Sequence, residues 1–218
     1  MSTRVPVIER IMKANDDIAK GNRQAFDAHD VHTVNIMASP GAGKTSLIIR
    51  TIEALEGRLK VGTIEGDLAS NVDSEKVRAT GTPAVQINTG GGCHLDAPQV
   101  KRALGDLPLD DIDLLFIENV GNLICPVGFA LGEHTRVAIS SIPEGDDKPH
   151  KYPTIFANVD ALVINKMDLL PAIPFDLQEF RRLVNTLNPG IPIFEVSCVT
   201  GEGLEEWAQW LIDLTVGK

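Results

Sequence analysis

The chain has 218 residues, 43% of them hydrophobic and 23% charged, a composition typical of a globular protein with one well-packed core. Its formal net charge of −10 at pH 7 argues against binding to nucleic acid or anionic lipid, because neither attracts an acidic surface. No apolar run approaches the roughly 18 residues of a membrane span, and acidic residues near the N-terminus argue against a secretory signal. We therefore expect a cytoplasmic protein without nucleic-acid or membrane partners, whose three cysteines stay reduced.

Apolar residues at helical spacing predict an amphipathic helix over residues 5–28 that is broken or frayed near Gly21. We treat residues 1–30 as an N-terminal helical extension and 31–218 as the domain proper. From there on, β-branched apolar runs alternate with amphipathic stretches. The expected strands cover 32–39, 59–67, 84–90, 113–120, 135–142, 160–166 and 191–196. The expected helices cover 44–57, 70–81, 97–107, 176–187 and 203–216.

This alternation predicts an α/β fold with a mostly parallel central sheet and helices on both faces. In such a sheet, ligands bind at the carboxyl ends of the strands. Two irregular stretches, 119–134 and 143–158, are longer than the usual connectors of a compact domain. We expect both to be functional loops.

The segment "ASPGAGKTS" after the first strand matches the phosphate-binding pattern G-x-x-x-x-G-K-S/T, except that Ala38 replaces the first glycine. Backbone N–H groups of this loop are expected to surround a β-phosphate, while Lys44 reaches the β and γ oxygens and Thr45 ligates Mg²⁺. A plain glycine-rich turn is the alternative, but it has no need for Gly-Lys-Thr in the first helical turn. The residues expected to contact phosphates are Gly41, Ala42, Gly43, Lys44, Thr45 and Ser46.

The tetrapeptide "NKMD" follows an apolar strand and is similar to the guanine-binding motif N-K-x-D. Asp168 is expected to accept hydrogen bonds from the guanine N1–H and exocyclic amine, Asn165 to serve the other edge, and the Lys166 stem to cover the base. Because adenine lacks that donor pair, the expected nucleotide is GTP or GDP. "SCVTGEG", after the last strand, is similar to a further guanine-binding loop; it adds Ser197 and Cys198, the latter as a small packing residue.

Two acidic strand ends are candidates for magnesium binding and hydrolysis. "IENVGN" ends a strand in E-x-x-G, where Glu118 would face the Mg²⁺ shell and Gly121 the γ-phosphate, within a segment that moves when that phosphate is lost. An ordinary strand-end carboxylate is the alternative for Glu118. "IEGD" places Asp67 where it would bind a Mg²⁺-bound water or orient the attacking water, and Glu65 is less favoured because it lies inside the run.

The segment "GGGCHLDAP" places Cys93 beside His94, and Cys125 follows the strand that ends in Glu118. Both cysteines are expected at the same sheet edge as the phosphates. Two thiolates and one imidazole leave a tetrahedral ion one ligand short, or suit square-planar nickel with ligands shared across a dimer. From the residues alone, metal ligation and ordinary buried thiols remain equally open. A Cys–His catalytic pair is disfavoured, because neighbouring side chains on an extended segment point apart.

With "SPGAGKT", "EGDLASN", "GGGCHLDAP", "ENVGNLICP", "EGDDKPHKYP" and "NKMDL" in this order, the chain resembles the HypB family, GTPases that assist nickel insertion into [NiFe]-hydrogenases. The resemblance runs from about residue 30 to the C-terminus and implies a P-loop three-layer fold with slow GTP hydrolysis. It implies Mg²⁺ as well, which agrees with our expectation from the motifs that Thr45, Asp67 and Glu118 hold this ion and that Lys44, Asp67 and Glu118 are catalytic. It also implies a nickel or zinc site at Cys93, His94 and Cys125.

The same resemblance implies partners. The family works as nucleotide- or metal-linked homodimers, together with other hydrogenase maturation proteins and the hydrogenase large subunit. Lys148 or Lys151 is expected to reach the nucleotide across the dimer interface. No cysteine precedes Cys93 and only His29 and His32 lie upstream, so the nickel-storing N-terminal tracts of some members are not expected. A urease-type or cobalamin-type chaperone GTPase, or a regulatory GTPase with structural zinc, remains the alternative.

Overall fold

The structure, a computed structural model, describes residues 7–67 and 77–217. These residues form a seven-stranded sheet in the order β3-β2-β4-β1-β5-β6-β7, and every neighbouring pair is parallel. The strands are β1 (His32–Ala38), β2 (Val61–Asp67), β3 (Ala84–Asn88), β4 (Leu114–Glu118), β5 (Thr135–Ser141), β6 (Ala161–Asn165) and β7 (Ile193–Val196). The predicted α/β fold with a parallel central sheet is confirmed.

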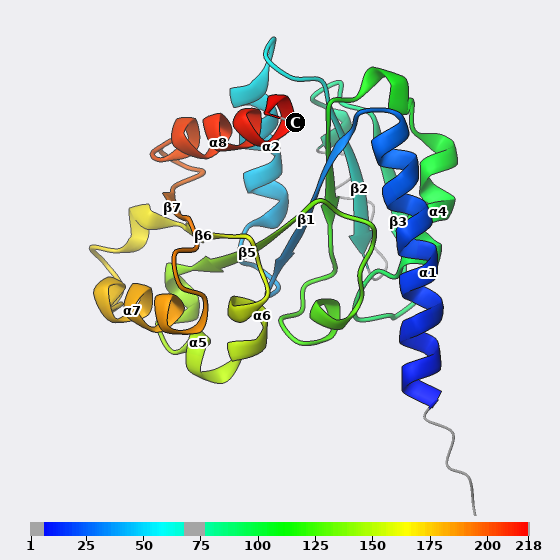
Figure 1. Cartoon of the computed structure of the whole chain (residues 1–218). Helices are drawn as coiled ribbons and strands as arrows, with labels where there is room; N and C mark the ends of the chain where they lie inside the picture. The colour runs from blue at the N-terminus through cyan, green and yellow to red at the C-terminus, as the bar shows by residue number, and fades with distance from the viewer. Residues whose placement is uncertain (1–6, 68–76, 218) are drawn as a thin grey trace, which may run out of the picture.

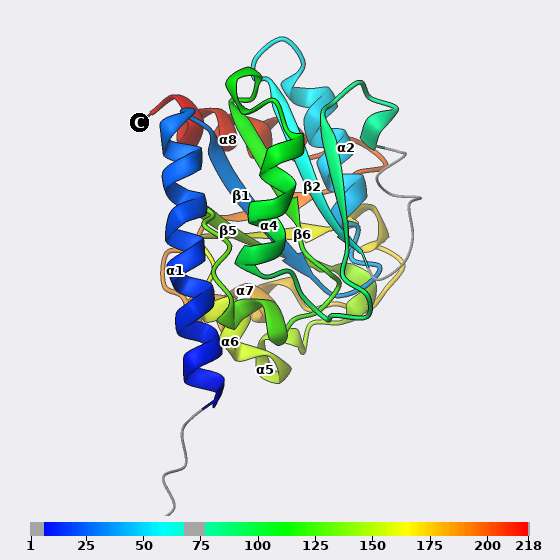
Figure 2. The same cartoon turned by 90° about the vertical axis from the view of Figure 1, so that its right-hand side faces the viewer.

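Helices cover both faces of this sheet (Figures 1 and 2). The α-helices are α1 (Val7–Ala28), α2 (Lys44–Leu55), α4 (Ala97–Ala103), α5 (Lys148–Lys151), α6 (Pro153–Ala157), α7 (Leu177–Leu187) and α8 (Leu204–Val216). Short 3₁₀ turns are η1 (Leu104–Asp106), η2 (Leu109–Asp111), η3 (Cys125–Gly128), η4 (Ile142–Glu144) and η5 (Met167–Leu169). Within the described ranges, no helix has both the length and the apolar character that a membrane crossing requires.

Alternation along the strands divides the core into layers, because successive side chains of a strand point to opposite faces. Leu114 and Phe116 of β4 pack with α2 and α8, whereas Leu115 and Ile117 pack with α1 and α4. On that second face, α6 and α7 cover the β5 and β6 end of the sheet. Burial of both faces explains why the strands appear in the sequence as continuous apolar runs.

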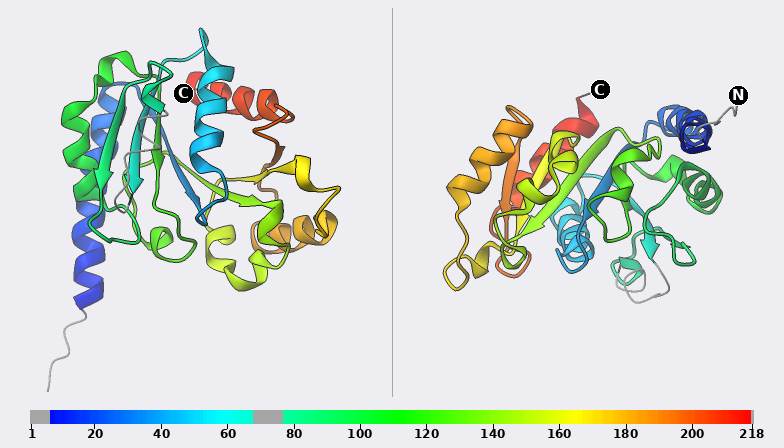
Figure 3. Two further views of the ribbon diagram at one scale, coloured as in Figure 1. Left: turned by 180° about the vertical axis from the view of Figure 1, so that it is seen from behind. Right: turned by 90° about the horizontal axis from the view of Figure 1, so that it is seen from below.

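Helix α1 is continuous through Gly21, so the predicted break there is wrong. A Cβ at Gly21 would meet nothing within 4 Å, which places this residue on the open side of the helix. On the packed side, Phe26 is fully buried and the Asn22 amide donates to the carbonyls of Ala97 (3.0 Å) and Leu131 (2.9 Å). This packing outweighs the roughly 1 kcal/mol by which glycine disfavours a helix interior. The first turns of α1 extend beyond the rest of the described chain (Figures 1 and 3).

The two expected loops differ in outcome. Residues 119–134 are irregular apart from the short turn η3, as predicted. Residues 143–158, in contrast, hold α5 and α6, so the prediction of an irregular stretch was wrong there. Each of these helices has only one turn and a proline at its start, and is therefore too short to show a helical period in the sequence. The helix expected at 70–81 lies mostly outside the described residues.

Candidate functional site

The turn between β1 and α2 has the conformation of a phosphate-binding loop. Gly41 and Gly43 have φ of 77° and 98°, values that favour glycine. A Cβ at Gly43 would also collide with the amide nitrogen of Asn165. The N-terminus of α2 opens on a pocket of about 320 Å³. Among the described residues it is lined by Gly41, Gly43, Lys44, Thr45, Ser46, Ile49, Glu118 and Lys166.

All the residues predicted to contact phosphates line this pocket except Ala42, which stabilises the loop instead. Its side chain is buried in the core, while its carbonyl accepts a hydrogen bond from Asn165 Nδ2 at 2.9 Å. A helix N-terminus and a lysine at the same opening attract a phosphate group. The arrangement suits an anionic ligand held locally on an acidic protein.

The pocket also holds a pair of oxygen ligands for a divalent cation. Thr45 Oγ1 donates to Glu118 Oε1 at 3.0 Å, and Glu118 is buried at the end of β4. A hydroxyl and a carboxylate are the hard oxygen donors that Mg²⁺ prefers, so these residues fit the expected ion. Asp67 lies at the end of β2 but is not among the described residues that line the pocket, and its carbonyl accepts from Thr89 N at 3.0 Å.

Glu65, the carboxylate less favoured from the sequence, lies next to Glu118 in the sheet. It is only 3% exposed and is the register partner of Glu118 on the neighbouring strand. Register partners on adjacent parallel strands face the same side of the sheet, so a second carboxylate lies beside Glu118. The available signal was an acidic residue inside a buried strand, a position that glutamate rarely occupies.

The predicted base-binding residues lie beside the phosphate loop. β6 ends at Asn165, and Lys166 takes a left-handed conformation with φ of 62°. Lys166 Nζ donates to Gly41 O at 2.6 Å, and the Asn165 amide donates to Ala42 O. Both side chains therefore connect the base-side loop to the phosphate loop.

Asp168 and Ser197 come together from two separate loops. Ser197 Oγ donates to Asp168 Oδ1 at 2.6 Å and accepts from Thr200 N at 3.1 Å. Cys198 Sγ donates to Asn165 Oδ1 at 3.4 Å, and burial raises the pKa of this thiol. The two segments that are similar to guanine-binding motifs thus form one hydrogen-bonded unit.

Cys93, His94 and Cys125 form a cluster in which one potential ligand atom of each residue lies within 4.8 Å of the others. Cys93 is exposed, while His94 and Cys125 are half-buried. The pKa of the Cys93 thiol is raised, first by a hydrogen bond with Cys125 and to a smaller extent by burial. Burial lowers the pKa of His94 against the opposing effect of Asp96, so its imidazole is neutral at pH 7 and able to ligate a metal.

Cys93 Sγ and His94 Nδ1 lie 3.5 Å apart, so the expectation that these neighbouring side chains point apart is wrong. The chain turns just before them, where Gly90 and Gly91 have φ of 60° and 97°. The raised pKa of Cys93 nevertheless disfavours a catalytic thiolate, which requires a lowered pKa.

Lys148 and Lys151 are not among the described residues that line the phosphate pocket of their own chain. Lys148 pairs with Glu144 at 3.5 Å, and Lys151 pairs with Asp147. The Lys151 side chain is 60% exposed. This exposure leaves the Lys151 side chain accessible to another molecule.

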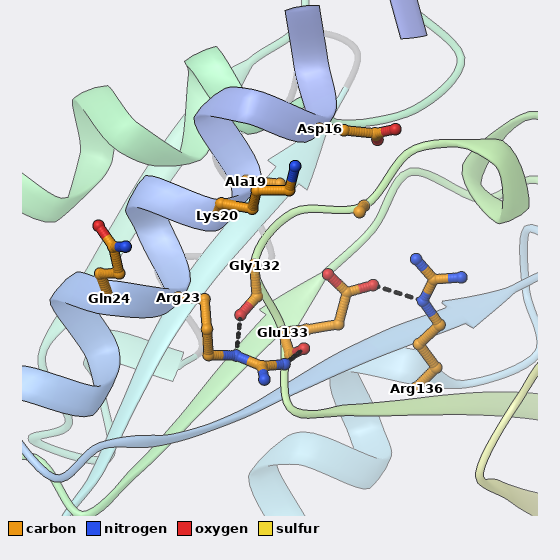
Figure 4. Close-up of a pocket in the computed structure, with 9 residues that line it drawn as sticks. Asp16, Ala19, Lys20, Arg23, Gln24, Gly132, Glu133 and Arg136 are labelled. Atoms are coloured by element: carbon orange, nitrogen blue, oxygen red, sulfur yellow. Dashed lines mark hydrogen bonds and ion pairs between the residues drawn. The ribbon is translucent and has the colours of Figure 1, made fainter. Parts of the chain in front are cut away.

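A larger hollow of about 660 Å³ lies against α1 (Figure 4). Both of its arginines are engaged within the chain: Arg23 Nε donates to Gly132 O at 2.8 Å, and Arg136 Nε donates to Glu133 Oε1 at 2.6 Å. Arg136 lies near the start of β5, whereas the phosphate loop follows the carboxyl end of β1. We therefore assign these contacts to the attachment of α1, away from the phosphate pocket.

Comparisons with known proteins agree with this geometry. The family model described as "CobW/HypB/UreG, nucleotide-binding domain" matches residues 32–195. The hydrogenase maturation factor HypB of Azotobacter vinelandii is 48% identical over 212 residues, covering 96% of this chain and 69% of the relative. The crystal structure of HypB from Archaeoglobus fulgidus has a TM-score of 0.87 and 43% identity, and covers 93% of this chain and 99% of that chain.

A second solved structure, HypB from Helicobacter pylori in complex with nickel, has a TM-score of 0.90 and 35% identity. The alignment covers 94% of this chain and 96% of that chain. These similarities confirm the predicted P-loop three-layer fold.

Proposed function

The chain belongs to the HypB family of hydrogenase maturation factors, and we propose that it is a GTP-hydrolysing metallochaperone that carries nickel for [NiFe]-hydrogenase. The observation that carries this proposal is the position of the Cys93, His94 and Cys125 cluster. Cys125 lies on the loop that begins directly after Glu118, the carboxylate hydrogen-bonded to Thr45. A change at the phosphates therefore acts on the same loop as a metal ligand.

At the nucleotide end, Lys44 and the α2 N-terminus bind the β- and γ-phosphates. Thr45 and Glu118 would hold Mg²⁺, which supplies charge neutralisation at the phosphate oxygens when it is bound. Asp67 is assigned to orienting the attacking water. Asp168, oriented by Ser197, accepts from the guanine N1–H and amine, and this selects GTP over ATP.

At the cargo end, two thiolates and one imidazole suit nickel or zinc. Three ligands leave one position of a tetrahedral ion for exchange with another molecule, and Cys93 is exposed. We propose that a second copy of the chain meets this face in a homodimer linked to nucleotide or metal, where Lys151 reaches the partner's nucleotide. The ion then passes to other maturation proteins and the hydrogenase large subunit.

The test is a titration of Ni²⁺ and Zn²⁺ into protein bound to GDP or to a non-hydrolysable GTP analogue, with mass measured alongside. We expect metal affinity to depend on the nucleotide and to fall in Cys93→Ala. Cys198→Ala is the matched control, because it removes a thiol outside the cluster and introduces the alanine usual at that motif position. Affinity unchanged both by nucleotide and by Cys93→Ala would contradict the proposal.

Metal removal separates delivery from a structural role. A transfer site predicts an apo protein that stays folded and still hydrolyses GTP, as followed by circular dichroism and phosphate release. Unfolding on chelation would instead identify a structural zinc site.

A further inference from the structure

Asn119 is a fully buried asparagine that directly follows Glu118. Its Oδ1 accepts from Leu95 N and from Val120 N, both at 3.0 Å. Its Nδ2 donates to Asn35 Oδ1 at 3.3 Å. One side chain therefore joins the loop after β4 to the segment that carries Cys93 and His94.

On the nucleotide side, Asn119 lies between two contacts with the phosphate-loop region. Its backbone N–H donates to Ile36 O on β1 at 3.0 Å. Two residues further along, a Cβ at Gly121 would lie 2.9 Å from the ring and backbone nitrogen of Pro40. These contacts tie the backbone that carries Asn119 to β1 and to the start of the phosphate loop.

On the metal side, Leu95 directly follows His94 and is fully buried. Its side chain packs on Gly66 so closely that a Cβ there would lie 2.7 to 2.9 Å from it. The hydrogen bond from Leu95 N to Asn119 Oδ1 is therefore buried as well, and it holds the backbone directly after His94.

The other half of the metal cluster is held by the same loop. Asn122 Oδ1 accepts from Ile124 N at 2.8 Å and from Cys125 N at 3.3 Å. The loop after Glu118 thus supplies one amide oxygen to each half of the cluster. Asn119 serves the Cys93 and His94 half.

The Asn119 side chain is also held from behind. Asn35 is fully buried, and its Nδ2 donates to Glu133 Oε1 at 3.3 Å. Glu133 in turn accepts from Arg136 at 2.6 Å (Figure 4). This network lies behind the amide nitrogen of Asn119, whereas its Oδ1 is held separately by the N–H groups of Leu95 and Val120.

We propose that Asn119 is the positioning residue that transmits the state of the nucleotide site, through Leu95 N, to the Cys93 and His94 half of the metal site. This inference rests on the proposed function, since it requires a metal at the cluster. Leu95 N follows Asn119 Oδ1 because a buried N–H without an acceptor is unfavourable. Asn119 itself touches neither nucleotide nor metal in this role.

The test measures the dissociation constant of Ni²⁺, by competition with a chromophoric chelator, in full-length protein bound to GDP or to a non-hydrolysable GTP analogue. The readout is the ratio of the two constants. Coupling between sites is typically about 5- to 150-fold, and we expect a wild-type ratio in that range. In Asn119→Ala the ratio falls to within about twofold of one, while GDP affinity is retained.

Asn35→Ala is the matched control, because it removes a buried amide from the same network but leaves the bond from Leu95 N to Asn119. We expect it to lower the melting temperature and to keep the ratio. Asn119→Ser, which keeps a hydroxyl but is too short to reach Leu95 N, replaces Asn119→Ala if that variant does not fold. A ratio retained in the Asn119 variants, or lost equally in Asn35→Ala, overturns the inference and leaves the proposed function intact. A wild-type ratio of one also overturns the inference, and it contradicts the proposed function when Cys93→Ala leaves the Ni²⁺ affinity unchanged as well.

Discussion

Ser197→Ala removes the hydroxyl that orients Asp168 and so tests the guanine-recognition half of the proposed function. Ser197 is fully buried, and its Oγ donates to Asp168 Oδ1 at 2.6 Å. A hydrogen bond to a charged group contributes about 1.5 to 3 kcal/mol. At 1.4 kcal/mol for each tenfold change, the dissociation constant of GDP rises by about 10- to 140-fold. We expect the lower part of this range, because Asp168 is only half-buried and water replaces part of the lost bond.

The assay is calorimetric titration with GDP and with inosine diphosphate, which lacks the exocyclic amine. Wild-type protein prefers GDP, because Asp168 accepts from both the amine and N1–H. In Ser197→Ala the ratio of the dissociation constants of inosine diphosphate and GDP moves closer to one, because the Asp168 carboxylate is no longer held in that orientation. Thr200→Ala, which keeps the bond between Ser197 and Asp168, is the control and binds GDP like wild type. A GDP dissociation constant for Ser197→Ala within about twofold of the wild-type value would refute the reasoning. Such a change is smaller than the loss of this hydrogen bond should cause.

Three further predictions concern other parts of the chain. Gly43→Ala adds a Cβ at φ of 98° against the amide of Asn165, so GDP binding is lost in the same titration, and wild-type binding would contradict the loop geometry. In a variant whose two cluster cysteines are serine, Cys198 reacts with iodoacetamide more slowly than a free thiol at neutral pH, because burial raises its pKa and lowers its thiolate fraction. Bound GDP slows this alkylation further, and mass spectrometry measures both rates. Alkylation of Cys198 at the rate of glutathione would contradict the raised pKa. Asn22→Leu leaves two buried carbonyls without their donor, and urea denaturation should show a loss of about 2 to 4 kcal/mol, whereas an unchanged midpoint would exclude this role in holding α1.

Much of the fold was predictable because its signals are local. The alternation of β-branched runs and amphipathic stretches predicted a parallel sheet with helices on both faces, and the described strands confirm it. The elements that were missed carry weak local signals. α5 and α6 are single turns with proline at their first or second residue, and the continuity of α1 through Gly21 depends on packing by the distant residues around Ala97 and Leu131.

Part of the candidate site was predictable for the same reason. The phosphate loop is one continuous segment, and a strand end in a parallel sheet has only one edge at which to place its side chains. The pairing of Glu65 with Glu118 was not accessible, because it depends on the register of two strands that lie far apart in the sequence. Nor was the bond between Ser197 and Asp168, which joins two loops through side-chain orientation.

The sequence by itself determined which segments form strands, which turn has the glycine pattern of a phosphate loop, and which three residues offer sulfur and imidazole ligands, because residue type and spacing control these properties within a few residues. Only the tertiary structure decided that Cys93 turns toward His94 and Cys125, and that Asn119 bonds to Leu95 N. Those contacts depend on strand register and on the rotamers of buried side chains, which the packing of the whole domain selects.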